Sequence, residues 1–559
     1  MFKLNKTELI FNVNTYIFIS LIEFFFLDEY FLYPEIYTLI WFIFCDFLTK
    51  FSVFNFLCII IIFFKILSFN KSKILSIKRL SIFFCVNIMK IFLLHLFKFP
   101  LLYSYFYLLY SFNWFGLVFN IKYSIGLDNL GFIFVFLTVF LIPISLLISW
   151  KSIYYNTKYF FILFLILEIL LINVFCAVDL MLFYISFESI LIPMYFLIGY
   201  WGSRDRKFHA AYQFFLFTLG GSLFMLIILI FCQLNFGSTN YNFLLNVSFS
   251  PYRELFMWGG FFIAFAVKIP MMPVHIWLPE AHVESATGGS VALAGILLKL
   301  GTYGIIRFLI PLFKFSSFFF TPFIFLISFF GVFYASLTTL RQIDLKKIIA
   351  YSSVIHMNYL MFGLFAYNIE GYIGSIILMV AHGFVSGGLF VCVGVLYERY
   401  HTRLKKPYGG LNNFMPFFSI FFLILTLANI SFPGSINFIG EFLVLLSILM
   451  KNFFLGFFVI FSMILSTCYS LWLYNKVFSG LVPSINYSFS QKISFNGLLF
   501  KSLFFKRFFL MNYSDLNLRE VIIIIYLLVP VIFLGLNPNT FIGLIEFDSL
   551  IYLTLLLTV

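Results

Sequence analysis

The sequence predicts an all-α polytopic membrane protein, a bundle of about 14 or more transmembrane helices, each about 20 residues long. Its 559 residues are 63% hydrophobic and only 10% charged, whereas a soluble domain is about 25% charged. Apolar runs long enough to cross a bilayer follow one another along the chain, and two of them are interrupted by prolines. The short alternating segments of a membrane β-barrel are not seen.

The apolar runs define the expected spans. The first 120 or so residues hold hydrophobic stretches near 9–27, 31–48, 52–68 and 80–119. Clearer spans follow near 131–150, 159–178, 180–200, 210–233, 257–278, 287–308, 319–340, 345–366, 372–397, 415–446, 454–475 and 521–536. We expect three segments: divergent N-terminal helices over 1–122, a core over 123–545, and an apolar tail over 546–559.

Charge separates the two ends of the bundle. Lys and Arg exceed Asp and Glu in the alternating loops near 151–158, 201–209, 341–347, 398–407 and 476–520, although not near 279–286. The loops between them are close to neutral. By the positive-inside rule, the basic set faces the inner side. This distribution also accounts for the net charge of +13, and no basic helix clear of the membrane indicates nucleic-acid binding.

Two apolar runs predict broken helices. In GGFFIAFAVKIPMMPVHIWLP, Lys268 is followed by Pro270 and Pro273, and in LANISFPGSINFIGEF, Pro433 and Gly434 precede Glu441. The second broken span is the fifth expected span after the first, and this odd spacing gives the two opposite membrane directions, so two five-helix units would be inverted copies. Paired broken helices in inverted repeats are typical of transporters and indicate their transport path.

Ionisable side chains inside apolar runs are the candidate functional residues. A charge at membrane depth costs several kcal/mol unless it has a partner or faces water, so each such residue indicates function. Each group can hold or release a proton according to its burial and neighbours, and together they predict a proton relay. The candidates are Glu188, Lys268, Lys299, His356, His382 and Glu441, with Glu168 as a weaker seventh.

Each candidate has a structural alternative. Glu188 and Lys268 can form a static ion pair that fixes helix packing, and the histidines can be hydrogen-bonded core residues. Glu441 can cap backbone freed by Pro433 and Gly434. His275, Glu280 and His282 lie near the inner end of the Lys268 run, where they would serve proton uptake or cap helix ends.

Several site types lack their signature. The seven cysteines are isolated, without C-x-x-C or metal-ligand spacing, so neither a disulfide framework nor an iron–sulfur cluster is indicated. Nucleotide-binding glycine motifs are missing. We therefore expect no cofactor-binding and no metal-binding residues in this chain.

Long segments resemble the antiporter-like membrane subunits of mitochondrial NADH:ubiquinone oxidoreductase, respiratory complex I, and among them the subunit 4 family. They are FESILIPMYFLIGYWGSRDRKF, AFAVKIPMMPVHIWLPEAHVESATGG, DLKKIIAYSSVIHMNYLMFG, AHGFVSGGLFVCVGVLYERYHTR and LANISFPGSINFIGEF. They run in family order through residues 123–545. Ser285 and Ala286 depart from the pattern, because the family usually has Ala-Pro there.

The resemblance implies roles for the matching residues. Glu188 resembles the fifth-helix glutamate that pairs with the seventh-helix lysine, here Lys268, and Lys299 resembles the central lysine of the eighth helix. His356 and His382 resemble polar relay groups of the second half. Two carboxylates complete the comparison: Glu441 resembles the twelfth-helix glutamate that distinguishes this subunit from its sisters, and Glu168 resembles a fourth-helix carboxylate.

The resemblance also implies the setting. The chain would be a multi-pass protein of the mitochondrial inner membrane, beside other membrane-arm subunits, sister antiporter-like subunits and lipids such as cardiolipin. NADH, FMN, iron–sulfur clusters and ubiquinone would be bound elsewhere in the complex. Two alternatives remain: a stand-alone cation/proton antiporter subunit with the same fold, and a structural membrane subunit, which would need no charges at mid-bilayer.

Overall fold

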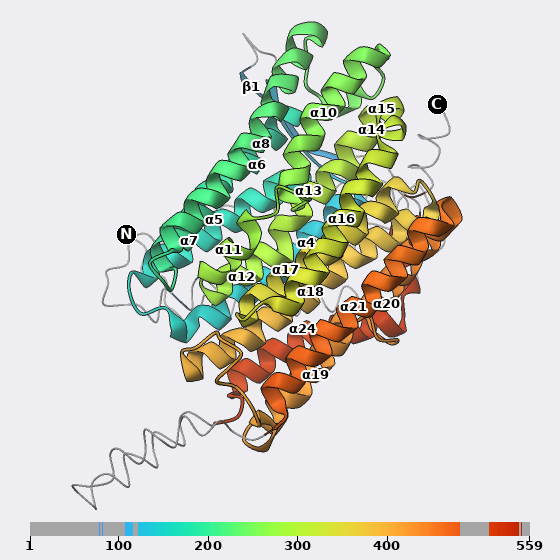
Figure 1. The fold of residues 1–559 in the computed structure, drawn as a ribbon. Helices are drawn as coiled ribbons and strands as arrows, with labels where there is room; N and C mark the ends of the chain where they lie inside the picture. Colours follow the sequence, from blue (N-terminus) through green and yellow to red (C-terminus); the bar gives the residue numbers. More distant parts are fainter. Residues whose placement is uncertain are drawn as a thin grey trace, which may run out of the picture. The chain divides into compact units, whose positions relative to one another are not determined.

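The computed structural model describes residues 107–115, 121–480 and 514–546, with the single positions 78, 81 and 549. All belong to the compact unit that spans residues 69–559, drawn in colour in Figure 1. Most of the expected N-terminal extension over 1–122 and of the apolar tail over 546–559 lies outside the described residues, so these boundaries stay predictions.

Helices form nearly all of the described part. The elements in chain order are β1 (Tyr107–Phe115), β2 (Ile121–Leu127), α4 (Asn129–Ser152), α5 (Thr157–Cys176), α6 (Leu180–Ser189), α7 (Leu191–Trp201), α8 (Lys207–Phe236), α9 (Tyr241–Leu244), α10 (Pro251–Lys268), α11 (Trp277–Glu284), α12 (Thr287–Ala292), η3 (Leu293–Leu297), α13 (Leu298–Gly304), η4 (Ile305–Leu309), α14 (Ile310–Leu312), α15 (Lys314–Phe319), α16 (Thr321–Arg341), α17 (Leu345–Phe365), α18 (Ile369–Tyr400), η5 (Leu411–Asn413), α19 (Pro416–Asn429), α20 (Ile436–Lys451), α21 (Phe453–Phe478) and α24 (Leu518–Leu536). The all-α class is therefore confirmed.

Ten helical segments within the described residues are long and apolar enough to cross a membrane. α6 and α7 together make one of them, and the series α12–η3–α13–η4–α14 makes another. α10 and the pair α19 and α20 are the predicted interrupted spans. The expected spans near 319–340, 345–366 and 454–475 correspond closely to α16, α17 and α21.

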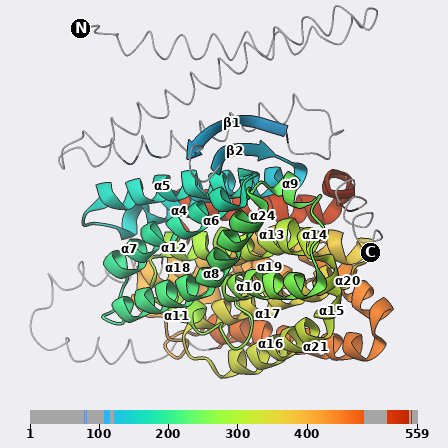
Figure 2. The same cartoon turned by 90° about the horizontal axis from the view of Figure 1, so that it is seen from above.

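One expected hydrophobic stretch differs from the prediction in its secondary structure. Residues 80–119 were expected to be hydrophobic and helical, but 107–115 form β1, which pairs antiparallel with β2. β2 packs on α5 and α6 at one edge of the bundle (Figure 2). Asn113 and Lys122 pair across this hairpin, and such polar residues are more easily placed in a hairpin than inside a spanning helix.

The core of the bundle is α18. It packs on α17, α20, α4, α12, α19 and α24 (Figure 1), and its central part is fully enclosed. α8, α16 and α21 instead carry rows of exposed apolar side chains, among them Phe224, Phe330 and Phe461. In a membrane protein such faces meet lipid, where apolar side chains are favourable.

Close helix contacts depend on glycine. At Gly374 of α18, an added Cβ would lie 2.7 Å from Leu443 Cβ and 3.0 Å from the Gly440 carbonyl oxygen of α20. Both are rigid atoms, so a larger residue would separate the two helices. Small residues at helix interfaces allow this close approach in membrane bundles.

We expect Gly374→Ala to destabilise the bundle by about 1–3 kcal/mol, the usual cost of overpacking. Gly259→Ala in α10 is the matched control, because nothing lies within 4 Å of its added Cβ. Thermal unfolding of the detergent-solubilised complex, followed by native gel, measures the difference. Equal loss of stability in both variants would contradict the packing argument.

Candidate functional site

Lys268 lies at a break in the bundle. α10 ends at Lys268, and α11 begins at Trp277. Pro270 and Pro273 occupy the break, where their missing N–H groups prevent a continuous helix. The Trp277 indole N–H donates to the Val267 carbonyl at 3.0 Å, which satisfies one backbone acceptor near this helix end. The predicted broken helix is therefore confirmed.

The Lys268 ammonium is enclosed without a hydrogen bond. The side chain is 2% exposed, and its Nζ finds no hydrogen-bond partner among the described residues. It lies 4.4 Å from the centroid of the Phe187 ring, a favourable position for a cation. Lys268 is thus a buried lysine whose ammonium lies against an aromatic face.

Glu188 is the nearest charged neighbour of Lys268. It lies at the end of α6, interacts electrostatically with Lys268 and forms a side-chain hydrogen bond with Ser222 of α8. Within the described part of the chain, no ion pair of 4 Å or less joins the two groups. The carboxylate and the ammonium are thus close enough to interact and are not locked together.

Lys299 contacts a histidine in the centre of the bundle. It is fully buried in α13, and its Nζ lies 2.8 Å from His382 Nδ1 of α18. The same Nζ donates to the Ala294 carbonyl at 2.5 Å. Ala294 belongs to the π-helical turn η3, a local distortion that is frequent at functional sites.

His356 and Glu441 form the next contact. His356 Nδ1 of α17 lies 3.0 Å from Glu441 Oε1 of α20, and both side chains are almost fully buried. His356 Nε2 lies 3.2 Å from Asn429 Oδ1, at the end of α19. The rings of His356 and His382 are 5.6 Å apart, centroid to centroid. Four predicted residues thus form one buried series: Lys299, His382, His356 and Glu441.

Glu168 is not among these contacts. It is fully buried in α5, which packs mainly on α4, α6 and α7. Glu188 and Lys268 lie next to each other but apart from the Lys299 series. The structure therefore brings four predicted residues into one buried series and two into an electrostatic pair, and it places Glu168 in α5.

Sequence reasoning missed Lys346, which lies with His282 in a cluster of buried groups at the inner side of the bundle. Lys346 was counted with the loop charges, but it is buried in the first turn of α17 and donates to the Ser285 carbonyl at 2.9 Å. His282 of α11 stacks on Phe390 at 4.7 Å and interacts electrostatically with Lys346 and Lys299. Adjacent residues point to different sides of a helix, so only one of the two neighbouring lysines is buried. Lys347 points to the partly exposed edge, where it pairs with Glu280.

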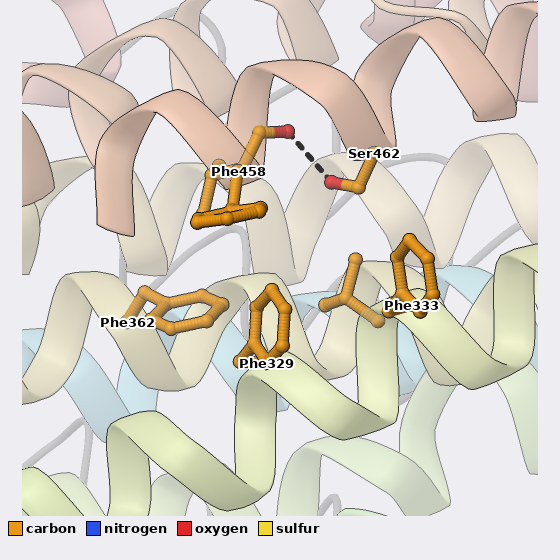
Figure 3. Close-up of a pocket in the computed structure, with 7 residues that line it drawn as sticks. Phe329, Phe333, Phe362, Phe458 and Ser462 are labelled. Carbon is orange, nitrogen blue, oxygen red and sulfur yellow. Dashed lines mark hydrogen bonds between the residues drawn. The ribbon is translucent and has the colours of Figure 1, made fainter. Parts of the chain in front are cut away.

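A small pocket lies between α16, α17 and α21 (Figure 3). Its walls are mostly phenylalanine rings from α16, α17 and α21: Phe329, Phe333, Phe362 and Phe458. The one polar side chain, Ser462, already contacts the Tyr359 hydroxyl at 2.7 Å and donates to the Val459 carbonyl at 2.6 Å. A water needs several polar partners, so this apolar pocket does not extend the buried series.

The described residues contain no group of three or more His, Cys, Asp or Glu side chains that could hold a metal ion. That this chain binds no cofactor remains a prediction from the sequence.

Comparison with known proteins gives the family. The NADH:quinone oxidoreductase/Mrp antiporter transmembrane family matches residues 177–467. NADH-ubiquinone oxidoreductase chain 4 of Arabidopsis thaliana is 52% identical over 423 residues, covering 76% of this chain and 81% of that protein. The protein of the same name from Chondrus crispus is 49% identical over 453 residues, covering 81% and 87%.

Solved structures agree. A chain of respiratory complex I from Thermus thermophilus with bound NADH aligns with a TM-score of 0.73 and 28% identity, covering 86% of this chain and 95% of that chain. A chain of the Mrp complex from Dietzia sp. shares the fold, with a TM-score of 0.70 and 18% identity over 84% of this chain and 49% of that one.

These findings define an antiporter-like membrane protein. The chain belongs to the NADH:quinone oxidoreductase/Mrp antiporter family and, within it, to the NADH-ubiquinone oxidoreductase chain 4 group.

We expect Trp277→Phe to loosen the Lys268 break, because it leaves the buried Val267 carbonyl without its donor, at a cost of about 1–3 kcal/mol. Trp258→Phe is the matched control: Trp258 is equally buried, but its N–H has no partner among the described residues. Thermal unfolding of the assembled protein should separate the two variants. Equal destabilisation would mean that the hydrogen bond contributes nothing.

Proposed function

We propose that this chain is a proton-translocating membrane-arm subunit of respiratory NADH:ubiquinone oxidoreductase. Protons would move from the matrix to the intermembrane space, driven by quinone reduction elsewhere in the complex. The observation that carries the proposal is the buried series from Lys299 through His382 and His356 to Glu441. Family membership supports the same reading.

Each contact of the series suits one proton transfer. Protonated Lys299 can donate to Nδ1 of neutral His382, 2.8 Å away. An imidazole that accepts at one nitrogen can release a proton from the other, and His382 Nε2 has no partner among the described residues. A ring rotation or one water would carry the proton across the 5.6 Å between the two rings. His356 would then donate to Glu441.

In this proposal, the interaction between Glu188 and Lys268 regulates when the proton transfer begins. While Glu188 is ionised and near, it stabilises the protonated lysine; if the complex moves the carboxylate away, Lys268 releases its proton more easily. α10 meets α13 closely at this break, since an added Cβ on Gly301 would lie 2.7 Å from Ile269 and 2.9 Å from the Phe265 carbonyl. A shift of the α10 end on a change in the charge of Lys268 would therefore press on the helix that carries Lys299.

The electrostatic energy of a buried pair of charges is of the same order as the energy needed to move a proton against the membrane potential. Moving one charge through 100 mV requires about 2.3 kcal/mol. Two unit charges 4 Å apart interact by about 4 kcal/mol at an effective dielectric constant of 20. Glu188 and Lys268 lie more than 4 Å apart, so their interaction is smaller than this value but of the same order as the energy needed to move one charge.

Proton uptake would begin on the inner side. Glu280 and Lys347 pair at 2.8 Å, each about a quarter exposed. Behind them, His275, His282 and Lys346 are buried, and His282 interacts electrostatically with Lys299. These groups form a stepwise path from the partly exposed edge to the central lysine, with Glu168 as a further buried carboxylate in α5.

The wider setting follows from the relatives. NADH, FMN, iron–sulfur clusters and ubiquinone would be bound by other subunits, and this chain would contribute no redox centre. It would lie in the mitochondrial inner membrane among other membrane-arm subunits, sister antiporter-like subunits and lipids such as cardiolipin. Residues 1–122 would be an extension that contacts neighbouring subunits.

We expect Lys299→Ala, Lys268→Ala and Glu188→Gln each to reduce NADH-driven proton uptake several-fold, because each removes a charge that the transfer needs. The measurement is uptake by proteoliposomes containing the whole complex, normalised to NADH oxidation. Lys476→Ala is the control, since Lys476 is exposed near the inner end of α21. Full uptake in all three variants would exclude the relay.

We also expect this chain to migrate on a native gel with NADH dehydrogenase activity and with flavin and iron–sulfur subunits identified by mass spectrometry. Migration without any redox partner would instead favour a stand-alone cation/proton antiporter.

A further inference from the structure

A buried ion pair closes the outer end of the helix that carries Lys299. Arg307 Nη1 lies 3.0 Å from Asp128 Oδ2, with the two side chains 17% and 3% exposed. Asp128 also caps α4 by accepting from the Gly131 amide at 3.0 Å. The Arg307 guanidinium packs on the Tyr241 ring, 4.8 Å from its centroid. The pair thus joins three segments that are distant in sequence.

The position of this pair relative to Lys299 is informative. Arg307 follows Lys299 by eight residues on the same helical series, a rise of about 12 Å. Arg307 belongs to the π-helical turn η4, and Lys299 donates to the turn η3. The pair therefore stands directly between the central lysine and the outer side.

The space between them is packed with aromatic rings. Tyr303 lies edge-on to Phe134 at 5.8 Å and to Phe175 at 5.1 Å, and all three are fully buried. The Tyr303 hydroxyl donates to the Phe175 carbonyl at 3.0 Å. A layer whose polar atom is already bonded offers no water chain for a proton.

Hydrogen bonds of the backbone and of one side-chain pair extend this closure at the outer surface. Val178 donates to the Ser124 carbonyl at 3.1 Å, and Tyr241 donates to the Val178 carbonyl at 3.2 Å. Asp179 accepts from the Thr239 hydroxyl at 2.5 Å. β2, residues 177–179 and residues 239–241 thus form a cap, which Arg307 contacts through Tyr241.

The inner end of the helix that carries Lys299 differs from the outer end in its titratable groups. There the titratable groups Glu280, Lys347, His275, His282 and Lys346 reach from the partly exposed edge to the neighbourhood of Lys299. At the outer end, the nearest charges are paired with each other. Arginine does not lose its proton in proteins, so Arg307 cannot relay a proton, and its carboxylate partner is already bonded.

We propose that the Asp128–Arg307 pair is a proton barrier, which prevents a proton on Lys299 from leaving directly to the outer side and directs it to His382. The inference rests on the proposed relay through Lys299. Stability alone does not favour such a pair, because apolar residues of similar volume often stabilise a core equally well. Asp128 and Arg307 are positioning residues and are not expected to carry the proton.

The test is passive proton leak in liposomes that contain the whole complex, without NADH or quinone. A potassium diffusion potential, negative inside, is imposed with valinomycin, and internal pH is followed with pyranine. We expect Arg307→Gln, which leaves the Asp128 carboxylate unpaired and able to take up a proton, to raise the leak rate at least tenfold. Adding Lys299→Ala should return the leak to the level of the unchanged complex.

Glu520→Gln is the matched control. Glu520 forms a buried pair with Arg399 at 2.7 Å and belongs to a capping box at the start of α24, towards the inner side. Loss of this pair should cost stability without causing a leak. Arg307→Met provides a second test if Arg307→Gln does not assemble, and Arg307→Lys, which retains the charge, should remain tight.

Two results would overturn the barrier: a tight membrane with an assembled Arg307→Gln or Arg307→Met complex, or a leak that persists after Lys299→Ala. Failure of the relay itself would be seen differently, as full NADH-driven proton uptake by the Lys299→Ala single variant. The two proposals are therefore separable.

Discussion

Ionisable groups buried in an apolar bundle must find partners, and this requirement organises the structure around α18. Lys299 can be fully buried because it contacts His382 and the Ala294 carbonyl, and Glu441 because it contacts His356. The side-chain partners come from different helices: α13 and α18 for Lys299 and His382, α17 and α20 for His356 and Glu441. The contacts that make burial tolerable therefore also place groups that exchange protons within transfer distance.

The helix breaks serve the same requirement. A continuous helix uses its backbone groups internally, whereas a break leaves them available within the bundle. α10 ends at Lys268, and α19 ends at Asn429, whose side chain contacts His356. This chain thus places irregular backbone next to its buried charges. Close glycine contacts, such as Gly301 against α10, keep the broken segments tightly packed.

The sequence was sufficient for some features and insufficient for others. Pro270, Pro273 and Pro433 have local effects on the backbone, so both breaks were predictable. Pairing depends on tertiary packing: nothing local indicates that Lys299 meets His382, or that Lys346 is buried while Lys347 is partly exposed. Asp128 and Arg307 were overlooked because each lies near the end of an expected span, where a charge normally needs no explanation.

The paired charges at the outer end give the buried series a direction that the series itself lacks. Proton transfers between Lys299, His382, His356 and Glu441 are reversible, because each group can both accept and donate. Net movement requires that a proton enter at one end and leave only at the other. Titratable groups on the inner side and an aromatic layer behind Asp128–Arg307 on the outer side would meet that requirement for the Lys299 helix. Glu441 would then be the remaining route outward.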